Sequence, residues 1–70
     1  MLEVTNETKV LLAEQEQAMW LRTVEQILIK IRVQKRLKND NEVKMLTEEM
    51  EKCENALDEI SKIIQELKQE

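Results

Sequence analysis

The sequence predicts an all-α protein, folded as an antiparallel two-helix hairpin. Two observations carry this prediction. Apolar residues recur at spacings of three and four along most of the chain of 70 residues, and glycine and proline are both absent. Since tight β-turns usually contain those two residue types, the composition disfavours an all-β fold. A chain of this length forms one domain, so we treat residues 1–70 as a single helical hairpin.

Residues 43–67 carry the clearest heptad pattern. Their apolar positions alternate between spacings of 3 and 4 without a break, which lines them along one face of a helix. This structural seam consists of Val43, Leu46, Met50, Cys53, Leu57, Ile60, Ile64 and Leu67. The positions between them are mostly charged and form a solvated face. The pattern predicts a helix over about 41–69.

The first half of the chain repeats the pattern less purely. Its seam consists of Val10, Ala13, Gln17, Trp20, Val24, Ile27, Ile31 and Gln34. Leu21 and Leu28 are expected to widen this seam. Residues 27–33 also alternate with a period of two, as a buried strand does. However, no second strand exists to pair with them and the heptad runs through them, so we expect a helix over about 6–38.

The polar stretch "KNDNE", residues 38–42, separates the two patterns and predicts a turn at about 39–41. Asparagine tolerates the left-handed conformation that ends helices, so Asn39 or Asn41 is expected to replace the missing glycine. Asn39 or Asp40 is the expected cap of the second helix, with Glu42 at the spacing of a capping box.

The first helix is expected to be capped by Thr5 or Asn6.

A connection as short as residues 39–41 makes the two helices antiparallel neighbours. Folding the chain about position 40 places Ile27 beside Cys53. One such seam is a small core, so we expect the hairpin to be completed by dimerisation or by a partner.

The first helix has a second apolar face, nearly opposite its seam. Arg22 and Gln26 interrupt this face in the middle, and a helix with two apolar faces is normally covered on both. Trp20 fits two interpretations, either as core or as an interface anchor. The predicted partner-binding residues are Leu12, Met19, Trp20, Ile29, Val33 and Leu37.

A basic cluster, "KIRVQKRLK" at residues 30–38, carries five positive charges in a chain whose net charge is −4. Residues 39–70 hold ten carboxylates and four lysines, so the cluster faces the most acidic part of its own chain. We expect Arg32, Lys35 and Arg36 to pair with carboxylates of the second helix. The alternatives are a nucleic acid or an acidic protein partner, and the acidic balance of the whole chain opposes the nucleic acid.

The residue types that catalysis needs are scarce. The chain has no histidine and no glycine-rich loop, one serine (Ser61) and one cysteine (Cys53), so no enzyme, catalytic residue or cofactor is predicted. The carboxylates of residues 48–54 are expected to be solvated rather than bound to a metal.

No apolar run is long enough to span a membrane. A lone cysteine suits a reducing, cytoplasmic location.

The whole-chain two-helix layout, the "KNDN" turn and the "CENALDEISKII" stretch resemble the small helical-hairpin co-chaperones of type III secretion needle subunits. The glycines that those loops often contain are missing here. The resemblance implies a bacterial cytoplasmic protein that binds an aggregation-prone helical subunit together with a second chaperone.

The sequence therefore predicts a non-enzymatic module for protein–protein interaction, such as an adaptor, a co-chaperone or an assembly subunit. Two alternatives remain. The chain is a structural coiled-coil segment of a larger assembly, or it binds nucleic acid through residues 30–38.

Overall fold

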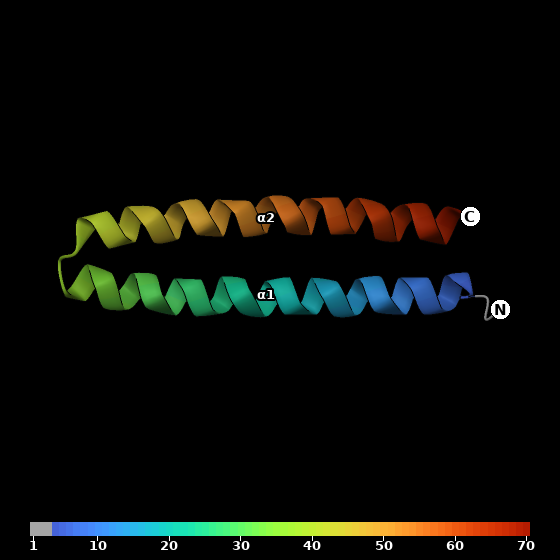
Figure 1. Cartoon of the computed structure of the whole chain (residues 1–70), viewed down its shortest axis with the longest axis horizontal. Helices are drawn as coiled ribbons and strands as arrows, with labels where there is room; N and C mark the ends of the chain where they lie inside the picture. Colours follow the sequence, from blue (N-terminus) through green and yellow to red (C-terminus); the bar gives the residue numbers. More distant parts are fainter. Residues whose placement is uncertain (1–3) are drawn as a thin grey trace.

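The computed structural model describes residues 4–70, and these form two antiparallel α-helices that lie side by side (Figure 1). α1 spans Asn6–Arg36 and α2 spans Asp40–Gln69. No strand occurs within the described residues, so the predicted all-α helical hairpin is confirmed. α1 ends two residues before the predicted bound, and α2 begins one residue before it.

The hairpin is a slender rod with extents of 54 × 17 × 17 Å and a radius of gyration of 16.3 Å. A compact domain of the same length would have a radius of gyration of ~11 Å. The solvent-accessible surface is 6061 Å². A compact monomer of 8.4 kDa exposes ~4,600 Å². The chain therefore leaves an unusually large share of its surface open to solvent or to a partner.

Burial within residues 27–33 distinguishes the helix from the strand that the alternation also fits. Ile27 and Ile31 are buried, whereas Ile29 and Val33 are exposed. A strand would place all four on one face, because its side chains repeat every two residues. The observed burial repeats every four residues, as one side of a helix requires.

The turn is a Schellman motif in which Lys38 takes the left-handed conformation, with a φ of 58°. The backbone N–H of Lys38 donates to the carbonyl of Lys35 at 3.1 Å, and that of Asn39 donates to the carbonyl of Gln34 at 3.0 Å. The prediction that Asn39 or Asn41 would be left-handed is therefore wrong. Asn39 has a φ of −95° because its side chain caps α2.

Both helices begin at a side-chain cap. The Thr5 hydroxyl accepts from the N–H of Thr8 at 3.2 Å, and the Asn39 carboxamide oxygen accepts from the N–H of Glu42 at 3.4 Å. Each cap satisfies one N–H that has no partner within its helix. A capping box would also use the N–H of Asn39, but the carbonyl of Gln34 already accepts from it.

The core lies between the helices. Ile27, Ile31 and Cys53 form a buried cluster, and half-buried side chains pack against it: Trp20, Val24, Val43, Leu46 and Met50. Towards the open end of the hairpin, Ile60 and Ile64 are buried, while Leu57 and Leu67 are half-buried. Even Ile27 and Cys53 keep 5% of their surface exposed, so two helices alone do not enclose a complete core.

Leu21 and Leu28 do not widen the seam as predicted. Leu21 is 52% exposed and Leu28 is 39% exposed. The contact between two helices covers one narrow stripe on each of them, and these two leucines lie beside that stripe rather than on it. They belong to the exposed surface of α1.

At the open end, the carboxamide nitrogen of Asn6 donates to the backbone oxygen of Glu70 at 3.5 Å. The first turn of α1 and the last residue of the chain therefore lie together, at the end of the rod opposite the turn (Figure 1).

Candidate functional site

α1 exposes large apolar side chains along its whole length. Five of the predicted partner-binding residues are exposed: Leu12, Met19, Ile29, Val33 and Leu37. The exposed fraction is 64% for Met19, 62% for Ile29 and 67% for Leu37. α1 further exposes Leu11, Leu21 and Leu28, and Val4 is exposed just before it, whereas α2 exposes Met45 and Ile63. The unpartnered apolar surface is therefore concentrated on α1.

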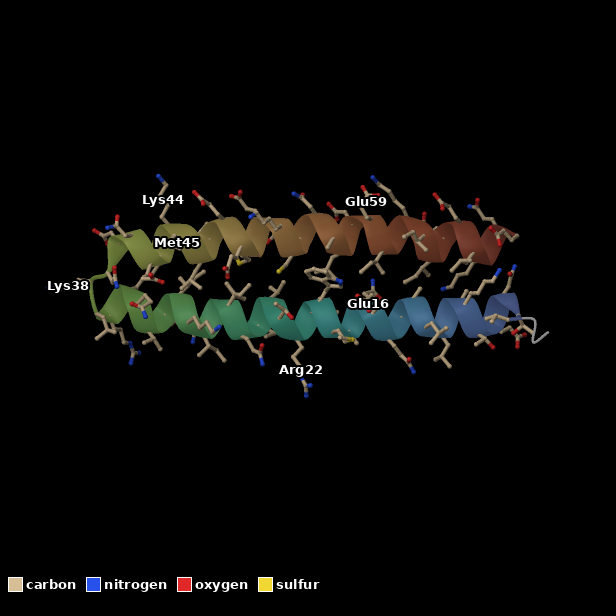
Figure 2. All side chains as sticks on the ribbon, in the orientation of Figure 1. Glu16, Arg22, Lys38, Lys44, Met45 and Glu59 are labelled. Carbon is tan, nitrogen blue, oxygen red and sulfur yellow. The ribbon has the colours of Figure 1, made fainter. Side chains whose placement is uncertain are left out.

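Arg22 divides the outer face of α1 into two apolar regions. Its side chain points away from α2, just as Lys44 and Glu59 on α2 point away from α1 (Figure 2). Leu12 and Met19 lie on one side of Arg22 in the sequence, and the ridge of Ile29, Val33 and Leu37 lies on the other. Residues four positions apart are neighbours on a helix surface, so this ridge is continuous.

Trp20, the sixth predicted partner-binding residue, is half-buried and packs against the core cluster. Its indole N–H donates to a carboxylate oxygen of Glu16 at 3.2 Å. An open hollow of about 300 Å³ lies beside it, lined by Glu16, Met19, Trp20, Arg22 and Thr23. Trp20 thus contributes to the core with one part of its ring and to an open surface with another.

Sequence reasoning missed the contribution of Glu16, Arg22 and Thr23 to this hollow. Two signals were present. Glu16 and Thr23 stand four residues before and three residues after Trp20, which makes them its neighbours on the helix surface. A large indole ring also holds its neighbours apart and leaves space between them.

The expected ion pairs between the basic cluster and α2 do not form. Within residues 4–70 the one ion pair joins Lys62 to Glu59, at 3.3 Å on α2. Lys30, Arg32, Lys35, Arg36 and Lys38 are all exposed and make no ion pair. The physical reason for Arg32 and Arg36 is their position. They follow the buried Ile31 by one and five residues, which turns their side chains away from α2.

The potentially reactive side chains are dispersed. The thiol of Cys53 is buried between the helices, and Ser61 is exposed on α2. Glu48, Glu49, Glu51 and Glu54 are exposed, and no cluster of three or more candidate metal ligands occurs in the described part of the chain. Neither α1 nor α2, as described, is apolar over the length needed to cross a bilayer.

Comparison with known protein families, with curated proteins and with solved structures finds no match for this chain.

Proposed function

We propose that this chain is a non-enzymatic protein-interaction module whose binding surface is the exposed apolar face of α1. The observation that carries the proposal is the uneven distribution of apolar surface. Leu12, Met19, Ile29, Val33 and Leu37 are all about half exposed or more, on a chain with far more surface than a compact monomer. Monomeric proteins rarely leave a large contiguous apolar surface uncovered.

Several features support a binding role for α1 and a structural role for α2. Trp20 and Arg22 border the hollow, and tryptophan and arginine are the residues most enriched among interface hot spots. α2 supplies a single seam and a charged outer face, so it acts as a brace that holds α1 straight. The absence of histidine from the sequence supports a role without catalysis.

The resemblance to type III secretion co-chaperones gives this proposal a specific form. The partner would then be an aggregation-prone helical subunit, bound in the cytoplasm along the apolar face of α1. An amphipathic helix laid into an apolar groove is a common mode of such recognition. The buried, unpaired thiol of Cys53 is compatible with that reducing compartment.

A nucleic-acid module is the second candidate, because the five basic side chains of residues 30–38 are exposed and unpaired. The net charge of −4 and the half-buried position of the single aromatic residue count against it. Binding to nucleic acid would weaken steeply with added salt. Binding through the apolar face of α1 would change little with salt.

The test is co-purification of the untagged chain with its partner from the native cell. We expect Ile29→Asp with Val33→Asp to abolish co-purification and to leave helicity by circular dichroism unchanged, because neither residue touches the seam. Asn55→Asp with Gln65→Asp is the matched control. It adds the same charge on exposed positions of α2 and should retain the partner. A partner that stays bound to the Ile29 and Val33 variant would rule the proposal out.

A further inference from the structure

A second stripe runs along α1 at heptad spacing, separate from the seam. Its members follow one another at spacings of 4, 3, 4, 3, 4, 3 and 4: Leu12, Glu16, Met19, Thr23, Gln26, Lys30, Val33 and Leu37. We call it the outer stripe. Four of the five exposed residues singled out above belong to it, and the hollow beside Trp20 opens on its first half. A spacing of this kind allows a helix to pack against another helix along a line.

The outer stripe is complementary to itself when reversed. We propose that a second copy of this chain occupies it, with the two α1 helices antiparallel and related by a two-fold axis between Thr23 and Gln26. Leu12 then lies opposite Leu37 of the second copy, and Met19 lies opposite Lys30. The outermost pair at each end is apolar, Glu16 lies opposite Val33 next to it, and the central pair of Thr23 and Gln26 is polar. This inference rests on the proposed function, because it assigns an occupant to the same surface.

Charge determines the direction of pairing. Residues 7–25 hold four carboxylates and two cations, whereas residues 30–38 hold five cations and no carboxylate. None of those five cations makes an ion pair within residues 4–70, so all are available to a neighbour. Antiparallel pairing places each basic segment along the acidic half of the other copy. Parallel pairing would place basic against basic, which costs free energy.

The hollow beside Trp20 fits the same arrangement. Residues 26–33 of the second copy lie over it, which brings Ile29 and Val33 to its rim. The aliphatic stem of Lys30 from the second copy covers Met19 of the first. Its ammonium group reaches towards Glu16 of the first copy, one turn away. That Glu16 carboxylate already accepts a hydrogen bond from Trp20 of its own chain. Each copy contributes one ridge and one hollow, as a two-fold interface requires.

The size of the contact suits a stable dimer. The outer stripe from Leu12 to Leu37 is ~38 Å long at ~1.5 Å per residue. The chain exposes 6061 Å², roughly 1,400 Å² above the value for a compact monomer of its mass. A standard interface buries about 800 Å² on each partner, so the excess is sufficient to form one.

The first experiment measures mass and direction on the intact chain. Sedimentation should give twice the 8.4 kDa of one chain. Under mild oxidation, a mixture of Leu12→Cys and Leu37→Cys variants should form a disulfide between the two variants. Each variant alone should cross-link far more slowly. The native chain is the control for Cys53, which is buried. A rapid cross-link within the Leu12→Cys variant alone would mean parallel pairing and would overturn the inference.

A charge reversal tests the pairing of the stripe. Glu16→Lys and Lys30→Glu should each weaken dimerisation by roughly tenfold, since each change occurs twice in the dimer. The double variant should restore most of the loss. Glu51→Lys with Lys44→Glu, on the exposed face of α2, should leave the dissociation constant within about twofold. Failure of the double variant to recover would overturn the proposed register.

The outcomes separate this inference from the proposed function. A chain that stays monomeric at all concentrations, yet loses a different protein on Ile29→Asp with Val33→Asp, refutes the dimer and leaves the proposed function standing. A dimer that survives that double substitution refutes the inference, because its contact then lies elsewhere, and the proposed function is still decided by whether the co-purifying protein is lost.

Discussion

The two helices of this hairpin have nearly equal length but very different surfaces. α2 buries its apolar residues on one side and presents charge on the other, with Met45 and Ile63 as its exposed apolar side chains. α1 buries a comparable seam and still exposes apolar side chains along its opposite side. α2 has the distribution of a helix in a finished two-helix structure. The apolar side chains of α1 are distributed as in a helix that has neighbouring helices on two sides.

Under the proposed function, this difference separates the residues that stabilise the hairpin from those that bind a partner. Substitutions in the seam of α2 should act on folding, since most of its large apolar residues lie there. Substitutions on the outer face of α1 should leave folding intact and act on association.

Leu57→Asp with Ile60→Asp should unfold the hairpin. Both residues lie in the seam of α2, and Ile60 is buried. Burial of unpaired carboxylates costs several kcal/mol, and a loss above about 4 kcal/mol exceeds what so small a domain can sustain. Circular dichroism at neutral pH measures the result. Retention of the native helical signal would mean that the seam is not where the stability of the hairpin resides.

The two N-caps should contribute unequally. Asn39→Ala removes a cap beside the turn, where the helices are held together, and should cost about 1 kcal/mol of unfolding free energy. Thr5→Ala removes the cap at the open end and should cost a few tenths of a kcal/mol. Helix ends far from the turn open locally more easily, so a cap there contributes less to the free energy of unfolding. Urea unfolding of the two variants gives the comparison. Equal losses would show that the open end is as firmly ordered as the turn.

Lys38→Gly should stabilise the chain by about 0.5 kcal/mol. Lysine at a φ of 58° bears a steric cost that glycine avoids, and the gain exceeds the extra chain entropy of glycine in the unfolded state. Lys44→Gly is the control, because it places glycine within α2 and should cost about 1 kcal/mol. A loss of stability in Lys38→Gly would contradict the left-handed turn.

Ile29→Gln with Val33→Gln should change the unfolding free energy of the monomer by less than about 0.5 kcal/mol, because both side chains are exposed and glutamine is a good helix former. Ile27→Gln with Ile31→Gln is the matched pair in the same helix, two residues earlier at each site. Both of its side chains are buried, and it should cost more than about 3 kcal/mol. Measurements at low protein concentration keep association out of the comparison.

Much of the fold was predictable from spacing alone. The uninterrupted alternation of 3 and 4 over residues 43–67 predicts a helix and its buried face, because a two-helix contact depends on little else. The identity of the left-handed residue was not predictable from composition. Asn39 is the better left-handed residue by type, but it can cap α2 only in a different backbone conformation, so Lys38 takes the strained position.

The exposure of five candidate residues was predictable from the sequence, whereas the shape of the surface that they form was not. Ile29 and Val33 each follow a buried residue, Ile27 or Ile31, by two positions. Residues two positions apart lie on nearly opposite sides of a helix, so Ile29 and Val33 are exposed. The hollow beside Trp20 depends on how the indole ring is packed, which a one-dimensional pattern does not contain. The ion pairs expected for Arg32 and Arg36 do not form for a similar reason. The register of the two helices brings residues close together, but it does not determine the direction in which a side chain points.

The single tight turn also sets an order in which the molecule assembles. Ile31 and Val43 are twelve positions apart in the chain, whereas Ala13 and Leu67 are 54 positions apart. Closing the longer loop first would cost ~1.3 kcal/mol more in chain entropy, so contacts form at the turn and extend towards the open end. The basic segment, next to the turn, is therefore in place before the hollow beside Trp20. Amide hydrogens near Ile31 should therefore exchange more slowly than those near Val10.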